Sequence, residues 1–373
     1  MSSMGDNTKS ADVSISVESV DDQSSSIPPP KIATTATEPP LSKKSRVDPR
    51  TDPYGYLGLV RNPDGSDTRK SNDDPKTPIS SYNGSPTLLV KDITVNESKN
   101  TWARVFLPKE AINSSPAGRK FPLLIYIHGG GFVICNVATP LFDKLYRIFT
   151  PEIPVMLVSI EYRRAPEHRL PAAYEDCLED LHWIKNSKDE WFTKYADFSN
   201  TFLMGSSAGG NIAYFIGLRA SVSPGDLKPL NIKGVILNQP FFGGVKRTRS
   251  ELRNANDKVL PTPLSDLMWE LALPVGSNRD HEFCNPILNY KKGQFNHIKA
   301  LGWKILVTGY YGDPLFDRQV ELVKMLEENG LPVLSKFDAG GYHGIDTAEW
   351  PNAKALSKVV KYFVESNIAT LTV

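Results

Sequence analysis

A serine flanked by two glycines stands in the stretch MGSSAGGNIAYF, residues 204 to 215, and is the first candidate for chemistry. The apolar run TFLM before it predicts a buried strand, and NIAYF after it predicts the start of a helix. In such a strand-to-helix turn Gly205 and Gly209 let the backbone cross closely, and Ser207 lies at the positive end of the helix dipole. The pattern predicts Ser207 as a nucleophile, although a Gly/Ser loop before a helix would have a similar composition.

A serine hydroxyl is a weak nucleophile at neutral pH, so it needs a histidine base and an acid that orients this base. Three histidines follow Ser207 in the chain: His281, His297 and His343. His343 lies in the Gly-rich segment DAGGYHGID before the last predicted helix, and we favour it as the base. His281 and His297 lie in polar segments, and we expect them at the surface or in local hydrogen bonds.

Two acids are candidates to orient the base, because the segment GYYGDPLFD follows the predicted strand KILVTG. Asp313 stands at the carboxyl end of that strand, where the sites of open α/β sheets are built. Asp317 falls inside the following helix, where we expect it to cap the helix or to pair with a base. We therefore predict Asp313 as the acid.

Hydrolysis by a serine also needs hydrogen-bond donors for the oxyanion that develops on the substrate. The segment HGGGF, residues 128 to 132, follows the predicted strand FPLLIYI, and its consecutive glycines let backbone N–H groups point at one spot. We predict Gly130, Gly131 and Ala208, the residue after the nucleophile, as the donors. His128 is expected to brace the loop.

The elements that must position these residues alternate along the chain. Short runs that are nearly continuous in apolar residues predict strands buried on both faces. Helical patterns separate them, at residues 171–187, 209–221, 316–330 and 351–366. This alternation predicts an α/β fold with a mostly parallel central sheet and helices on both faces, entered through an exposed antiparallel hairpin at 88–96 and 101–108.

Composition limits the partners and the compartment. The 43 Lys+Arg and 42 Asp+Glu of the 373 residues nearly balance, which argues against nucleic acid or an anionic membrane as a partner. The first twenty residues lack the features of a secretory signal, and no run is long enough to span a membrane. The three cysteines are far apart and lack metal-ligand spacing, as in a cytoplasmic protein with reduced thiols. We expect no metal and no cofactor, and leave the oligomeric state open.

Domain organisation follows from a change in composition near residue 52. Residues 1–51 are rich in Ser, Thr, Pro and Asp and almost lack aromatic residues, which predicts a disordered tail. Residues 52–373 are predicted to form a single domain.

Five motifs in order, HGGGF, EYRRAPEHRLPAAYEDC, GSSAGG, GDPLFD and GYHG, together resemble the hormone-sensitive-lipase family of α/β-hydrolases, and within it the plant carboxylesterases. The likeness extends from about residue 52 to the C-terminus. It implies the α/β-hydrolase fold, the triad Ser207, Asp313 and His343, and structural roles for Arg163 and Glu167 beneath the site. It also implies a small cap from about 52–75 and 241–300, the second segment being an insertion after the sixth strand. Two departures, Ser206 before the nucleophile and YRRAPEH where YRLAPEH is usual, put substrate preference in question.

Three functions are compatible with the resemblance. The first is hydrolysis of small carboxylic esters, such as O-acyl groups of plant specialised metabolites, through an acyl-enzyme on Ser207. The second is a non-catalytic receptor, because the related gibberellin receptors share the fold and motifs; in them the catalytic histidine is replaced, whereas His343 is present here. The third keeps the site but uses it for elimination, decarboxylation or cyclisation.

The insertion is expected to shape the substrate pocket. Its amphipathic helix around Leu264, Met268 and Leu271 is predicted to lie over the carboxyl edge of the sheet. We predict Phe132, Met268 and Trp269 as pocket residues. Short or medium acyl esters of a bulky apolar alcohol should be preferred over long-chain lipids, because nothing resembles a lipid-binding surface.

Overall fold

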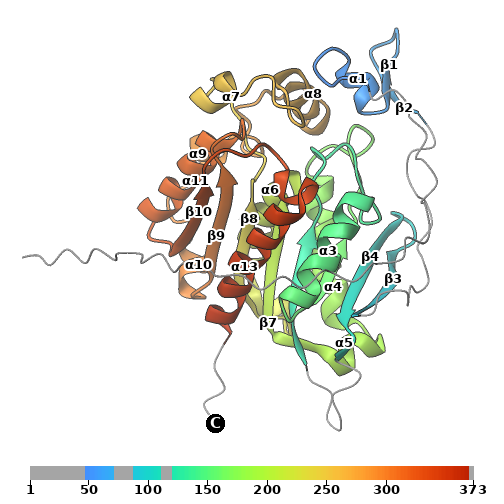
Figure 1. Cartoon of the computed structure of the whole chain (residues 1–373), viewed down its shortest axis with the longest axis vertical. Helices are drawn as coiled ribbons and strands as arrows, with labels where there is room; N and C mark the ends of the chain where they lie inside the picture. Colours follow the sequence, from blue (N-terminus) through green and yellow to red (C-terminus); the bar gives the residue numbers. More distant parts are fainter. Residues whose placement is uncertain (1–46, 71–86, 111–119, 369–373) are drawn as a thin grey trace, which may run out of the picture. The chain divides into compact units, whose positions relative to one another are not determined.

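The computed structural model of the chain describes residues 47–70, 87–110 and 120–368. They contain an eight-stranded sheet in the order β10-β9-β8-β7-β5-β6-β4-β3 (Figure 1). The strands are β3 (Leu88–Asn96), β4 (Thr101–Pro108), β5 (Phe121–Ile127), β6 (Met156–Ile160), β7 (Ala196–Ser206), β8 (Ile232–Asn238), β9 (Lys304–Tyr310) and β10 (Val333–Asp338). Strands β3 and β4 pair antiparallel with each other, β4 pairs antiparallel with β6, and the other pairings are parallel. The predicted mostly parallel sheet with an antiparallel entry is confirmed.

Helices cover both faces of this sheet (Figure 1). One face packs against α3 (Pro140–Glu152) and α13 (Trp350–Asn367), and the other against α4 (Ala172–Asn186), α6 (Ala208–Val222) and α11 (Phe316–Glu328). The short helix α12 (Ile345–Ala348) contacts α3 and α13. Along β5, Leu123 and Ile125 join one core cluster and Leu124 and Tyr126 the other. Because alternate side chains serve two cores, the strand must be apolar at nearly every position, as its sequence predicts.

Strand β4 corrects the prediction of an exposed hairpin. All eight of its residues are buried, because β4 lies between β3 and β6 instead of at the edge of the sheet. Its polar residue Arg104 is also buried, and the guanidinium pairs with Asp92 at 2.7 Å and with Asp143 at 3.2 Å. The alternation of polar and apolar letters therefore came from a buried ion pair and not from exposure to solvent.

Further segments lie at one end of the sheet (Figure 1). They are α1 (Pro53–Tyr56), β1 (Leu59–Arg61), β2 (Asp67–Arg69), α7 (Arg249–Arg253) and α8 (Thr262–Ala272). Helix α1 contacts α8, and Arg61 of β1 pairs with Glu270 of α8 at 2.7 Å. The two predicted cap segments, distant in sequence, are thus in contact.

The remaining helices are short. They are α5 (Glu190–Tyr195), the 3₁₀ helix η1 (Pro224–Leu227), α9 (Pro286–Asn289) and α10 (Asn296–Ala300). Near the start of the described residues, the Asp52 side chain accepts a hydrogen bond from the Gly55 N–H and caps α1. The predicted disordered tail lies outside the described residues up to position 46, and so do residues 71–75 of the first predicted cap segment.

Candidate active site

Ser207 stands in a sharp turn between β7, which ends at Ser206, and α6, which begins at Ala208. Its φ of 56° and ψ of −119° are a backbone conformation that residues other than glycine rarely adopt. A Cβ atom on Gly205 would collide with the carbonyl of Gly209, and one on Gly209 would collide with the carbonyl of Ile127. The two glycines therefore allow the close crossing that holds Ser207 in this strained conformation.

The structure brings the three predicted triad residues into one hydrogen-bonded chain. His343 Nε2 lies 2.9 Å from Ser207 Oγ, and His343 Nδ1 lies 3.0 Å from Asp313 Oδ2. Ser207, Asp313 and His343 follow β7, β9 and β10, whose carboxyl ends meet at one edge of the sheet. With the Nδ1 proton donated to Asp313, Nε2 accepts the serine proton, which is the arrangement that a general base requires.

Three carboxylates surround the His343 side chain, which is only 4% exposed. Burial by itself lowers the pKa of His343, but Asp313, Asp257 and Asp346 together raise this pKa above its ordinary value. Asp257 belongs to the insertion between β8 and β9, and its Oδ2 lies 3.4 Å from the backbone N of His343. The histidine is therefore a stronger base than one in water, and the insertion reaches its backbone.

The Asp313 carboxylate accepts hydrogen bonds on both oxygens. Oδ1 accepts from the Leu315 N–H at 2.8 Å, and Oδ2 accepts from Gln239 Nε2 at 2.7 Å and from Gln319 Nε2 at 3.1 Å. Gln239 was not predicted from the sequence, although it directly follows β8 at the same sheet edge. Its position at the carboxyl end of a strand is the sequence feature that could have identified it as a site residue.

Asp317 serves a different purpose from the one predicted. It lies in the first turn of α11, where its Oδ2 accepts a hydrogen bond from the Ser250 N–H at 2.8 Å. Its own N–H donates to Ser250 Oγ at 3.0 Å. Asp317 therefore attaches α7 to α11, and the prediction that it caps its helix or pairs with a base is wrong.

The glycine loop after β5 lies against the serine turn. Gly130 and Gly131 have φ values of 116° and 59°, and a Cβ atom added to Gly129 would contact Ser207. In the described part of the chain, the N–H groups of Gly130, Gly131 and Ala208 donate no hydrogen bond to another loop or side chain. These donors remain predictions for the oxyanion site. His128 is fully buried and stacks on Tyr162 with ring centroids 4.4 Å apart, as expected of a residue that braces the loop.

A cavity of about 140 Å³ lies over Ser207 and His343. Its walls are mostly apolar and include Ile134, Phe142, Val259, Leu260 and Met268. The Met268 side chain lies against Gly131. Tyr56 and Leu141 also line the cavity and are 37% and 40% exposed, so they form its solvent-facing rim.

Two of the predicted pocket residues lie behind this wall. The Trp269 ring stacks on Phe241 at 4.6 Å between centroids and lies 5.4 Å from the Phe132 ring. Phe132 and Trp269 are each 1% exposed and do not line the cavity. Met268 is thus the wall residue, whereas Phe132 and Trp269 pack behind the wall, which corrects their prediction as pocket residues. Met268 and Trp269 differ because successive residues of a helix point in different directions.

Ser206, next to the nucleophile, points back into the protein. Its Oγ lies 2.5 Å from the Tyr126 hydroxyl and accepts from Asn238 Nδ2 at 3.0 Å. Nearby, the Tyr310 hydroxyl donates to the buried Asp346 carboxylate at 2.7 Å. Burial raises the pKa of Asp346 to about 6, an effect that the hydrogen bond from Tyr310 only partly offsets.

Asp346→Asn is expected to stabilise the protein in a pH-dependent manner. A carboxyl with a raised pKa in the folded state destabilises the fold when it ionises, and here the cost is about 3 kcal/mol above pH 6. The cost falls below that pH and disappears below the ordinary value of 3.8. The melting temperature of Asp346→Asn should therefore exceed that of the wild type at about pH 8 and nearly match it at about pH 4. An equal shift at both pH values, or a pH-dependent shift in the surface control Asp226→Asn, would contradict this account.

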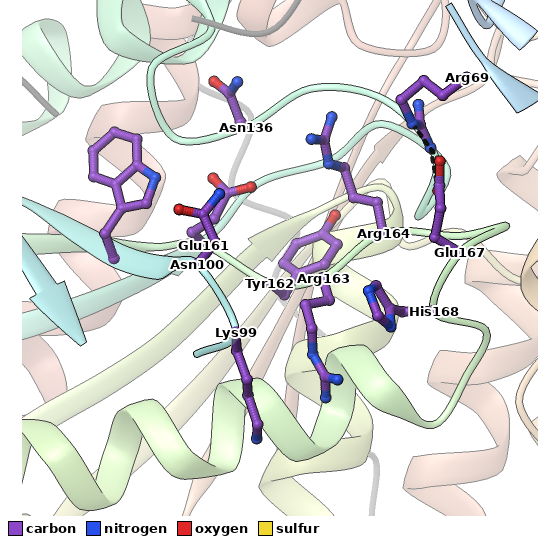
Figure 2. A pocket seen from close by; sticks show the side chains of 11 residues that line it. Arg69, Lys99, Asn100, Asn136, Glu161, Tyr162, Arg163, Arg164, Glu167 and His168 are labelled. Atoms are coloured by element: carbon purple, nitrogen blue, oxygen red, sulfur yellow. Dashed lines mark hydrogen bonds and ion pairs between the residues drawn. The ribbon is translucent and has the colours of Figure 1, made fainter. Parts of the chain in front are cut away.

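A second cavity, of about 310 Å³, is lined mainly by charged and polar side chains and does not include Ser207 (Figure 2). Two of its arginines already have carboxylate partners. Arg69 makes two hydrogen bonds of 2.9 Å with Glu167, and Arg163 binds Asp176 at 2.8 Å. These pairs attach β2 and α4 to the loop after β6. The positive charges of Arg69 and Arg163 are already balanced by carboxylates, which makes them poor partners for an anionic ligand. The cavity over Ser207 is therefore the candidate site.

Among the described residues, no cluster of His, Cys, Asp and Glu side chains has the arrangement of a metal site. None of the described helices is both long and apolar enough to cross a membrane.

Comparisons with known proteins find relatives of this chain. A family model described as alpha/beta hydrolase fold matches residues 124–347. Carboxylesterase 20 of Arabidopsis thaliana is 44% identical over 86% of this chain and 99% of its own length. A 3-O-acetylpapaveroxine carboxylesterase of Papaver somniferum is 40% identical over 84% of this chain and 99% of its own. The solved structure of an esterase from Pyrobaculum calidifontis, 23% identical, matches the fold with a TM-score of 0.62 over 76% of this chain and 86% of that one.

Proposed function

Because the chain belongs to the carboxylesterases of the α/β-hydrolase fold, and is thus a carboxylic ester hydrolase, we propose that it cleaves its ester through an acyl-enzyme on Ser207. The observation that carries this proposal is the hydrogen-bonded chain from Asp313 through His343 to Ser207, which opens on an apolar cavity. The same three groups perform acyl transfer on several unrelated folds.

Each group has a step in the proposed reaction. Ser207 Oγ attacks the ester carbonyl carbon while its proton passes to His343 Nε2. The oxyanion accepts hydrogen bonds from the N–H groups of Gly130, Gly131 and Ala208, each worth roughly 3 kcal/mol in the transition state. His343 then returns the proton to the departing alcohol, which leaves the acyl group on Ser207. A water molecule attacks this ester with His343 again as base, which releases the carboxylic acid and restores the serine.

The cavity supports a short acyl group and a larger, apolar alcohol as substrate. A volume of about 140 Å³ accommodates few groups beyond the reacting ester, and Met268 closes it beside Gly131. The exposed rings and methyl groups of Tyr56 and Leu141 offer apolar surface to whatever extends from the mouth. We therefore propose acetyl or similarly short esters, a class that includes O-acetylated plant specialised metabolites.

A cytoplasmic location, which the sequence predicts, remains part of this proposal. Cys177 and Cys284 are buried thiols without a disulfide, and burial raises the pKa of each. Such thiols are compatible with a reducing compartment.

The direct test is covalent labelling of the serine. The wild-type protein should react with a fluorophosphonate and hydrolyse p-nitrophenyl acetate, and mass spectrometry should place the label on Ser207. A protein that binds esters but neither reacts with the probe nor releases the phenol would be a receptor. Phenol release without an acyl-enzyme would favour another chemistry at the same site.

Met268→Ala is expected to shift the preference towards longer acyl groups. Removing the side chain beside Gly131 enlarges the cavity, and one misfit methylene changes the specificity by roughly 1 to 3 kcal/mol. The ratio of kcat/KM for p-nitrophenyl butyrate to that for the acetate should rise about tenfold. Leu267→Ala, on the same helix but away from the cavity, is the control and should leave the ratio unchanged. An unchanged ratio in Met268→Ala, or faster cleavage of triolein emulsions than of soluble esters, would refute this view of the pocket.

A further inference from the structure

Gln239 is the one side chain in the described residues that hydrogen-bonds both to the acid and to the loop carrying the base. Its Nε2 donates to Asp313 Oδ2 at 2.7 Å and to the Tyr342 carbonyl at 3.1 Å. Its Oε1 accepts from the Gly344 N–H at 3.0 Å. The amide therefore contacts the residues on both sides of His343.

These contacts determine how the amide is oriented. Both acceptors lie at Nε2 and the donor lies at Oε1, so a flipped amide would place like groups against each other at all three contacts. The backbone of Gln239 is held as well, since its N–H donates to the Thr308 carbonyl at 2.9 Å. Its φ of 44° lies in the left-handed region and the residue is 1% exposed. A strained, buried residue of this kind is retained where the surroundings require its side chain.

We propose that Gln239 is a positioning residue for ester hydrolysis, which holds the His343 loop and the Asp313 carboxylate in register with each other. This inference rests on the proposed role of the triad. A loop with several glycines does not by itself hold the imidazole to the fraction of an ångström that proton transfer requires. The amide supplies that constraint from the residue that directly follows β8, an interior strand of the sheet.

Gln319 is a natural control within the same site. Its Nε2 also donates to Asp313 Oδ2, at 3.1 Å, and it is fully buried. Within the described residues its side chain makes no hydrogen bond to residues 342–344, so it shares the bond to the acid but not the bonds to the base loop. Comparing the two glutamines separates the effect of holding the loop from the effect of the hydrogen bond to Asp313.

The first test compares Gln239→Met with Gln319→Met, because methionine keeps the length of the side chain but not its hydrogen bonds. Misplacement of a catalytic group by about 1 Å costs up to 10²-fold in rate, so kcat for p-nitrophenyl acetate should fall roughly 10- to 100-fold in Gln239→Met. In Gln319→Met it should fall less than about threefold. Rates are taken per site labelled by fluorophosphonate, so that loss of folded protein does not count.

The pH profile tests whether each glutamine acts on the charge that Asp313 presents to the imidazole, which a mere loss of packing would not change. The groups facing His343 are Asp313, Asp257, Asp346 and Ser207. In either methionine variant Asp313 loses one competing donor, so its charge acts more on the imidazole and the acid limb of kcat/KM should move to higher pH. The rate of Gln239→Met relative to wild type should therefore fall further as the pH is lowered.

Gln239→Glu should show the opposite trend. Its carboxyl has the shape of the amide and, when protonated, can donate to Asp313 and accept from Gly344; when ionised, it repels Asp313. Above the pH at which His343 becomes protonated, the rate relative to wild type should thus rise as the pH is lowered. Equal losses in Gln239→Met and Gln319→Met, or a Gln239→Glu rate that does not rise over this range, would overturn the inference. If the wild-type protein does not react with the fluorophosphonate, the proposed function itself is overturned.

Discussion

Replacing Ser207 or His343 with alanine is expected to lower kcat for ester hydrolysis by roughly 10⁵- to 10⁶-fold, the scale seen when one member of such a triad is removed. Ser207→Ala removes the nucleophile that is 2.9 Å from Nε2, and His343→Ala removes the group that takes its proton. Because the two act as one unit, the double variant should lose little more than either single variant. The residual rate above that of water would come from the oxyanion donors and substrate binding.

The measurement is kcat with p-nitrophenyl acetate for the two single variants and the double variant. Circular dichroism and the melting temperature serve as controls for folding, because Ser207 is partly accessible and its replacement should not disturb the core. Losses that add in the double variant would mean that Ser207 and His343 do not share a step, and that another base serves the serine.

Asp313→Asn should have the second largest effect, a loss of about 10⁴-fold in kcat. Asparagine keeps the shape of the residue but presents an amide to Nδ1, which favours the imidazole tautomer with its proton on the wrong nitrogen. It also removes the largest of the charges that raise the pKa of His343, so the acid limb of the residual activity should move to lower pH.

Asp317→Asn is the matched control, since it lies four residues on in the same segment and contacts Ser250 instead of the histidine. Its kcat should stay within about threefold of wild type, while its melting temperature falls by a few degrees as the attachment of α7 weakens. A larger loss of activity in Asp317→Asn than in Asp313→Asn would show that the acid has been wrongly identified.

The parts of the fold that sequence predicts best are those where one local pattern determines the environment. Strands β5 to β9 are buried on both faces, so their apolar runs identify them directly. No continuous apolar run marks strand β10, none of whose residues is fully buried, because an edge strand does not need such a run. Strand β4 was misjudged because the ion pair of Arg104 depends on Asp92 and Asp143, which lie elsewhere in the chain.

The same distinction applies to the site. Ser207, Asp313 and His343 each follow a strand of a parallel sheet, so the rule on carboxyl ends brings them together without knowledge of side-chain contacts. Gln239 and Asp257 escaped notice because their partners are distant along the chain and each looks like an ordinary polar residue of a loop. The distinction between Met268 and Trp269 likewise depends on the rotation of α8 about its axis, which apolar periodicity leaves open between neighbours.

The order of strands in the sheet has a consequence for how activity arises during synthesis. Ser207 follows β7 near the middle of the sheet, whereas β9 and β10 add at one edge beyond β8 and carry Asp313 and His343 at their ends. At 5 to 20 residues per second, the ribosome needs roughly 7 to 27 seconds to add the 136 positions that separate the serine from the histidine. A nascent chain, or one cut short before β10, thus holds the serine without its base. Under the proposed mechanism, ester hydrolysis therefore requires a completed sheet, and a chain that lacks β10 should be inactive.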